Sequence, residues 1–381
     1  MSDVLLTYGW NRVAYQILRN MTEHNLKVIT SDESKHNMCS MSKYSKECFT
    51  YPNPYLKQSD FIKVLIAKIN KHKPAVLIPI HEEAFIIAKY IDKFPRSLII
   101  PISDYDTLIK GHDKITASKI AKDAGLNVPR IYNINQALSY ENKKLVLKLA
   151  RSNGAKGVFY TNSKKDLEKL YLTNKDADFY IQDYIKGKGY GASFLYNKGK
   201  MITGFVHKRL TEKTHTGGVS TKRISIKNKK ILNDGKKILD KLKWHGVAMV
   251  EFKYDEDNDV NWFIEINARY WGSLALPIAS GLDIPYWHYC IGTGKDFNVN
   301  DYKNNIVSKW VLGELITLVE RIQNRKLTLN ELKSILNFSV DNFDDYYPDD
   351  KKAFIGELYY YFKKFIKTRS VNPEVEGIEK I

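Results

Sequence analysis

The chain has 381 residues, of which 43% are hydrophobic and 27% are charged. This is an ordinary composition for a globular protein with two or three packed lobes, and so many charges argue against a membrane protein. No stretch approaches the ~20 consecutive apolar residues that a bilayer span needs. The first residues, MSDVLLTYG, lack the basic start and cleavage site of a signal peptide, so we expect a cytoplasmic protein.

The net charge is +17, from 60 Lys and Arg against 43 Asp and Glu. Such an excess indicates either a polyanionic partner or a lysine-rich solvated surface. The lysines are spread along the chain and no five-residue block of Lys and Arg occurs, so we favour the solvated surface over a nucleic-acid partner. The three cysteines, Cys39, Cys48 and Cys290, lack metal-ligand spacing and predict no disulfide framework.

The first 110 residues alternate short apolar runs with amphipathic segments. We expect strands at 4–7, 26–30, 75–80 and 98–102, and helices at 12–23, 61–70 and 82–91. This alternation predicts a doubly wound parallel α/β domain over residues 1–110. Ligands of such sheets lie beyond the carboxyl ends of the strands, where Gly9, Trp10, Ser31, Asp32, His81 and Glu82 fall.

The middle of the chain predicts two further lobes. A helix at 114–124, strands at 145–149 and 158–160 and a helix at 164–171 indicate a small α+β lobe over 111–185. A large, mainly antiparallel lobe over 186–300 is expected from strands at 190–196, 201–207, 220–226, 248–254 and 261–267, with a helix at 229–242.

The last part, residues 301–381, has helical periodicity. We expect helices at 307–323, 329–336 and 354–366, followed by a tail. An aromatic-rich helical extension that caps the core is a better interpretation than a partner-binding helix.

Two neighbouring strands of the large lobe carry polar side chains among apolar residues. Glu251 and Glu265 each lie between two apolar residues, and Asn267 shares a strand face with Glu265 because alternate residues point the same way. A carboxylate in an apolar strand is costly unless it is paired or binds a cation. Two carboxylates and an amide oxygen suit Mg²⁺. Alone, this pattern fits a solvated sheet face equally well.

A second pattern favours a phosphate site. Lys148 lies inside the apolar run 145–149 and is followed by the loop SNGAKG at 152–157. Backbone N–H groups of such a loop can face phosphate, and a lysine on a strand supplies a fixed positive charge. Farther along, the strand YIQDYIKG at 180–187 ends in polar residues and a glycine, as a hinge against an adenine edge would.

The order and spacing of these motifs resemble the ATP-grasp superfamily over residues 1–295. The most specific part is VEF at 250–252 followed by FIEINAR at 263–269, which resembles the metal-binding signature of the family. The resemblance implies an ATP-grasp fold: a parallel pre-ATP-grasp domain, a small lobe, a large lobe and, here, the helical extension. Ala268 stands where proline is common, and Lys188 and Gly189 stand where many relatives have a ribose-binding glutamate.

The resemblance also implies roles for single residues. Glu251, Glu265 and Asn267 would hold Mg²⁺, with two ions expected and Mn²⁺ as an alternative, while Arg269 and Lys148 would stabilise the transferring phosphate. ATP would be bound by Lys114, Lys148, Gly154, Ala155 and Gly157, and its adenine by Gln182, Asp183, Tyr184 and Ile185. The acceptor pocket would be formed by Arg209, His215, Gly217, Gly218, Arg223, Trp271, Gly272 and Ser273, with Trp10, Asn11, His81, Glu82, His207, Thr216, Tyr270 and Leu274 as further candidates.

This resemblance implies a ligase that joins a small carboxylate to an amine through an acyl phosphate and releases ADP and phosphate. A carboxy-phosphate enzyme similar to biotin carboxylase or carbamoyl phosphate synthetase is the enzyme alternative, and the single ATP-grasp unit argues against it. A nucleotide-binding module without catalysis is the alternative of another class. The partners expected are small molecules, and the sequence leaves homodimer formation open.

Overall fold

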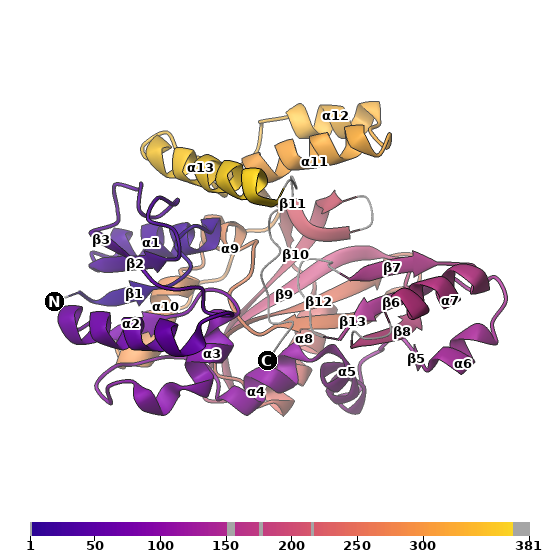
Figure 1. Cartoon of the computed structure of the whole chain (residues 1–381), viewed down its shortest axis with the longest axis horizontal. Coiled ribbons are helices and arrows are strands. Elements are labelled where there is room, and N and C mark those ends of the chain that lie inside the picture. Colours follow the sequence, from indigo (N-terminus) through magenta and orange to yellow (C-terminus); the bar gives the residue numbers. More distant parts are fainter. Residues whose placement is uncertain (1, 151–156, 175–177, 215–216, 369–381) are drawn as a thin grey trace.

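The structure is a computed structural model that describes residues 2–150, 157–174, 178–214 and 217–368. Its strands form three sheets: a parallel sheet near the N-terminus, a small antiparallel sheet in the middle of the chain, and a seven-stranded sheet between them (Figure 1). We call them sheets A, C and B. None of the described helices is long and apolar enough to cross a bilayer.

Sheet A is parallel, as the sequence predicts, in the order β3-β2-β1-β4. Its strands are β1 (Val4–Leu6), β2 (Val28–Asp32), β3 (Glu47–Thr50) and β4 (Val76–Ile78), and its helices are α1 (Arg12–Glu23), α2 (Gln58–His72), α3 (Glu83–Lys89) and the short 3-10 helix η1 (Ile91–Lys93). Alternate residues of β1 enter different cores: Val4 and Leu6 pack with α1, and Leu5 packs with α2 and α3. Helices therefore cover both faces. The strand expected at 98–102 is reduced to one bridge, Val76 to Ile99.

Sheet C belongs to a small lobe with its own core. After α4 (Tyr105–His112) and α5 (Lys114–Asp123), the sheet has the order β5-β8-β6-β7. The lobe contains β5 (Ile131–Tyr132), α6 (Ile134–Leu138), β6 (Leu145–Leu149), β7 (Val158–Thr161), α7 (Lys164–Thr173) and β8 (Phe179–Asp183). Its buried apolar residues form a cluster separate from the other cores. A lobe that shares no apolar core with its neighbours can change its position as a unit.

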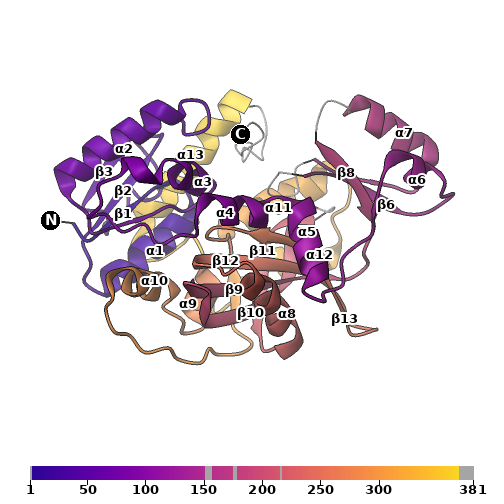
Figure 2. The same cartoon turned by 90° about the horizontal axis from the view of Figure 1, so that it is seen from below.

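Sheet B runs in the order β13-β12-β9-β10-β11-β14-β15. It contains β9 (Lys188–Asn197), β10 (Lys200–Thr214), β11 (Gly217–Ile226), β12 (Gly246–Asp255), β13 (Val260–Asn267), β14 (Val307–Lys309) and β15 (Asn342–Phe343). Helix α8 (Lys229–Lys241) packs against it, and α9 (Ala275–Ala279) and α10 (Ile284–Thr293) follow (Figure 2). All pairs are antiparallel except β14 with β15.

The C-terminal region is helical, but not entirely as the sequence predicts. Its helices are α11 (Val311–Gln323), α12 (Leu329–Leu336) and α13 (Lys351–Thr368). All three lie along the upper edge of the molecule in Figure 1, and α11 packs against α12. The expectation of a helix from residue 307 is wrong, because Val307–Lys309 pairs with β11 as strand β14. Apolar residues of this region, including Trp310 and Tyr360, join the core that α1 shares with sheet B.

Candidate active site

One cavity of ≈ 520 Å³ opens where the three sheets meet. One end, which we call the nucleotide end after the ATP that the sequence leads us to expect there, is lined from the small lobe by Lys144, Val146, Lys148, Tyr160, Gln182, Tyr184 and Ile185. Its middle is lined by Glu251, Glu265 and Asn267 of sheet B. Its other end, which we call the acceptor end, is lined by Tyr8, Trp10, Asn11, Arg12, His81, Tyr360 and the segment Trp271, Gly272 and Ser273.

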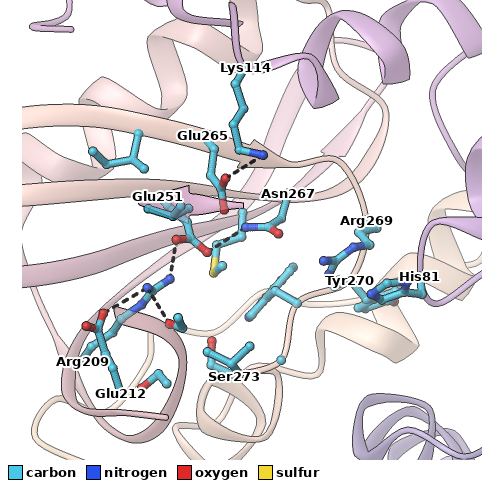
Figure 3. A pocket seen from close by; sticks show the side chains of 18 of the residues that line it. His81, Lys114, Arg209, Glu212, Glu251, Glu265, Asn267, Arg269, Tyr270 and Ser273 are labelled. Atoms are coloured by element: carbon cyan, nitrogen blue, oxygen red, sulfur yellow. Dashed lines mark hydrogen bonds and ion pairs between the residues drawn. The ribbon is translucent and has the colours of Figure 1, made fainter. Parts of the chain in front are cut away.

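The middle of the cavity holds two opposed carboxylates. Glu251 on β12 is the direct cross-strand partner of Glu265 on β13, and Met249 is the partner of Asn267. Both carboxylates and the Asn267 amide therefore project from one face of the sheet, as Figure 3 shows. The Asn267 amide Nδ2 donates to Glu251 Oε1 over 2.8 Å. Like charges directly opposite each other destabilise a sheet, so a cation near both carboxylates would offset their repulsion.

Protein cations flank the pair from two sides. Lys114 Nζ, at the start of α5, is 3.4 Å from Glu265 Oε2. Arg209 Nη2, on β10, is 2.5 Å from Glu251 Oε2, and Arg209 also contacts Glu212 over 3.3 Å and the carbonyl of Gly218 over 3.2 Å. Asp113 caps α5 by accepting the amide of Thr116, which holds Lys114 at the first helical position.

The two carboxylates differ in their electrostatics. Burial raises the pKa of Glu251, and the Arg209 guanidinium opposes this only in part. Burial also acts to raise the pKa of Glu265, but the surrounding cations, Lys114 first, outweigh it and lower that pKa. Glu265 is therefore the carboxylate better prepared to bind a cation in its ionised form.

Lys148 extends from the central strand of the small lobe toward the same carboxylates. Burial lowers the pKa of Lys148 to about 8, with Glu265 acting in the opposite direction. A lysine with this pKa is only partly charged at mildly alkaline pH, and an incoming polyanion would restore its charge.

The donor set fits Mg²⁺. Among the residues that the structure describes, no group of three His, Cys, Asp or Glu side chains could hold a metal. Glu251, Glu265 and the Oδ1 atom of Asn267, whose Nδ2 is turned toward Glu251, offer hard oxygen donors that still need ligands from elsewhere. Mg²⁺ is commonly bound in this way, by one or two carboxylates plus the oxygens of a phosphate.

The acceptor end is built mainly from aromatic rings. Tyr8 stacks on His81 at 4.7 Å between ring centroids, and Trp10 stacks on Tyr360 of α13 at 4.4 Å. Tyr270 also lines the cavity, and its hydroxyl contacts His288 Nδ1 over 2.9 Å. Burial lowers the pKa of His288 to about 4, so its ring is neutral and can accept from Tyr270 while Nε2–H donates to the Pro101 carbonyl over 2.6 Å.

Arg269 lies between the carboxylate pair and this aromatic end, on the side of Tyr270 and His81 (Figure 3). Its Nη1 donates to the carbonyl of Tyr270 over 2.8 Å. Ser273 Oγ is 3.4 Å from Nε2 of His207, a histidine whose pKa burial keeps well below its usual range. A neutral His207 adds no charge between Arg209 and the acceptor end.

Most residues singled out in the sequence line the cavity, and some do not. Gly154, Ala155, His215 and Thr216 lie outside the described residues. Gly157 does not line the cavity, and the side chain of Asp183 pairs with Lys143 and Tyr132 in the small lobe. Arg223 and Leu274 are fully buried outside the cavity, and Glu82 lies in a small second pocket with His112 and Lys114.

Sequence reasoning missed several residues of the cavity, among them Arg12 and Tyr360. Arg12 was assigned only to the first turn of a helix, and Tyr360 only to a helical cap. Their spacing in the sequence carries no signal, because they reach the cavity from opposite ends of the chain. The lysine at 144, two residues before the cavity residue Val146, could have been found from the period of two along β6.

A family model described as ATP-grasp domain matches residues 111–273. No curated protein matches the chain by sequence. The fold is similar to N5-carboxyaminoimidazole synthetase from Staphylococcus aureus complexed with ADP, with a TM-score of 0.67 and 18% identity over 85% of this chain and 86% of that one.

Two further solved structures share the fold. The biotin carboxylase domain of 2-oxoglutarate carboxylase from Hydrogenobacter thermophilus, in complex with MgADP, ADP and bicarbonate, has a TM-score of 0.65 and 16% identity over 81% of this chain and 73% of that one. L-amino acid ligase from Bacillus licheniformis has a TM-score of 0.61 and 15% identity over 76% of this chain and 74% of that one.

Proposed function

Because residues 111–273 match a family model described as ATP-grasp domain, we propose that this protein is a magnesium- and ATP-dependent ligase that joins a carboxylate to an amine. The observation that carries the proposal is the opposed pair Glu251 and Glu265 in one cavity with Lys114, Lys148 and Arg269. These residues provide two ionic ligands for a cation and three positive groups for a polyanion.

The reaction would proceed in two steps. The substrate carboxylate attacks the γ-phosphorus of ATP, forms an acyl phosphate and releases ADP. The amine then attacks the acyl carbon, the C–O bond to phosphate breaks, and inorganic phosphate leaves as the nitrogen loses a proton. Neither step needs a nucleophilic side chain, because phosphoryl transfer depends mainly on positioning and neutralisation of charge.

The polar groups in the middle of the cavity have a place in this scheme. Glu251, Glu265 and Asn267 would hold Mg²⁺, which supplies charge neutralisation at the β- and γ-phosphates when bound. Lys114 and Lys148 would hold phosphate oxygens. Arg269, between the carboxylate pair and the acceptor end, would stabilise the acyl phosphate while the amine attacks.

The small lobe would close over ATP. Gln182, Tyr184 and Ile185 line the nucleotide end where β8 leaves the small lobe, in the position of an adenine hinge. The separate core of this lobe would allow it to move as a unit, and closure would keep water from the acyl phosphate.

The decisive test is a screen of carboxylate–amine pairs for Mg²⁺-dependent release of ADP and phosphate, with detection of the coupled product by mass spectrometry. We expect at least one pair to give stoichiometric ADP, phosphate and amide. Release of AMP and pyrophosphate would contradict the acyl-phosphate route. ADP release that requires only bicarbonate would favour a carboxy-phosphate enzyme, and ATP binding without turnover would favour a binding module.

A further inference from the structure

Arg12 is a buried cation at the acceptor end that the proposed chemistry does not yet use. It opens α1 directly after the loop that carries Trp10, it is 3% exposed, and it lines the cavity. No motif pointed to it, because an arginine in the first turn of an amphipathic helix is ordinary in sequence.

The guanidinium plane of Arg12 is held on two sides. Its Cζ atom lies 3.7 Å from the centroid of the Trp310 ring. On the cavity side lies Gly272, where an added Cβ would be only 2.8 Å from Arg12 Nη2. Because residue 272 is a glycine, the Arg12 guanidinium has room beside it. The orientation of its N–H donors is therefore fixed before a ligand binds.

The charge of Arg12 is incompletely balanced. Its Nε is 3.6 Å from Asp344 Oδ2, too long for a hydrogen bond, and that Nε has no hydrogen-bond partner within the described part of the chain. Arg223 contacts the same Asp344 directly, so two guanidinium groups share one carboxylate. A buried cation with an unmet N–H donor is costly, and an anionic ligand that accepts from it would offset that cost.

The other acids packed nearby have partners of their own. Glu357 of α13 accepts from Trp310 Nε1 over 3.1 Å. Burial and Asp345 raise the pKa of this carboxyl well above its usual value, although the nearby Arg12 charge acts in the opposite direction. Asp345 accepts the amides of Val311 and Leu312 at the start of α11, over 2.9 Å each. These groups hold the C-terminal helices in place and leave Arg12 to face the cavity.

The cavity is polarised along its length. Among its described lining residues the only carboxylates are Glu212, Glu251 and Glu265, and Glu212 pairs with Arg209. The carboxylates of the cavity thus lie in its middle, flanked by Lys114 and Arg209, whereas the acceptor end combines Arg12 with aromatic walls and has no carboxylate among its described lining residues. A molecule with an anionic group at one end and an amine at the other would match this polarity, with the amine directed toward the site of the acyl phosphate.

We propose that Arg12 binds the carboxylate of the amine substrate, which is therefore an amino acid or a molecule with the same pairing of amine and carboxylate. This inference rests on the proposed ligase function for its orientation. A planar guanidinium suits a carboxylate because it donates two parallel N–H bonds to the two oxygens. The stacked rings of Trp10 and Tyr360 would contact the remaining part of that substrate.

The test measures binding rather than turnover. Wild-type protein with Mg²⁺ and a non-hydrolysable ATP analogue is titrated with the L- and D-amino acids, with their carboxamides, and with O-phosphoethanolamine as an amine that carries phosphate. We expect at least one amino acid to bind and its carboxamide to bind about tenfold to 100-fold more weakly, the range expected for a charge-assisted hydrogen bond. Equal affinity for acid and amide, no binding of any amino acid, or preferential binding of the phosphoamine would overturn the proposal.

Variants separate this role from a structural one. Arg12→Met should abolish the discrimination between acid and amide, while affinity for the ATP analogue stays as in wild type and in the exposed control Arg96→Met. If Arg12→Met fails to fold, Gly272→Ala answers the same question, because its new Cβ displaces the guanidinium without removing it. Retained discrimination in a folded variant would refute the assignment. Failure of the ligase proposal is visible separately, as absence of ADP release in the screen.

Discussion

The two ends of the cavity are built on different principles. The nucleotide end and the carboxylate pair use side chains of regular strands within residues 145–267, such as Lys148 on β6 and Glu265 on β13. The acceptor end joins the loop before α1, the segment after β13 and helix α13, which are hundreds of residues apart. In the proposed function, the first end would bind the nucleotide and the second would bind the amine substrate.

The largest expected effect lies at the carboxylate pair. Glu265→Gln removes one ionic ligand while keeping the shape of the side chain, so Mg²⁺-dependent ADP release should fall by about 100-fold or more with little loss of fold. Steady-state kinetics over a range of Mg²⁺ concentrations measures this. The exposed Glu141→Gln should match wild type. Undiminished activity of the Glu265 variant would remove the metal assignment.

Arg209 connects the two ends, and its loss should be visible in stability. Arg209→Met leaves Glu251 without its ion-pair partner at 2.5 Å, which should lower the free energy of unfolding by about 3 kcal/mol, as breaking a buried pair does. Because Mg²⁺ with ATP would supply a new cation beside Glu251, their addition should stabilise this variant more than wild type. Urea unfolding with and without Mg²⁺ and ATP measures both effects, and equal gains for the two proteins would argue against a cation at Glu251.

The nucleotide end should respond to pH through Lys148. Its pKa of about 8 in the free protein would be raised by bound phosphate, so ATP binding takes up a proton above pH 8. The ATP affinity should therefore fall about tenfold between pH 7 and pH 9, by the linkage of one proton. Isothermal titration calorimetry at several pH values measures this. The side chain in Lys148→Arg stays charged at these pH values, so the ATP affinity of this variant should depend little on pH. If its ATP affinity still falls between pH 7 and pH 9 as in wild type, another group is responsible for the pH dependence.

The smallest expected effect belongs to the aromatic wall. Tyr360→Leu loses the stack on Trp10 but fills similar space, so the free energy of unfolding should fall by about 1 kcal/mol. The KM of the acceptor should rise severalfold, whereas the KM of ATP should not change. Tyr359→Leu, one residue away and 43% exposed, is the matched control. If the KM of ATP rises together with the KM of the acceptor, the nucleotide end and the acceptor end of the cavity are coupled.

The local pattern of the chain already determined much of the first end. The alternation along β13 places Glu265 and Asn267 on one face, and the hairpin with β12 brings Glu251 opposite them, all within one stretch of chain. The parallel character of sheet A and the small lobe were also predictable, because periodicity and turn residues are properties of neighbouring residues, whereas strand β3 and the strand order were not predicted. The same reasoning failed at Val307–Lys309, where the segment Val-Ser-Lys pairs with β11 instead of extending a helix.

Only the tertiary structure decided the second end. Arg12, Trp310 and Asp344 meet because α1 packs against the C-terminal region, and no spacing in the sequence encodes that contact. Tertiary packing also removed Arg223 from the candidate ligands by pairing it with Asp344, although its sequence context matched that of Arg209. Strand periodicity tells which residues share a face of a sheet. Whether a charged side chain can still bind a ligand depends on whether folding brings it a partner of opposite charge from far along the chain.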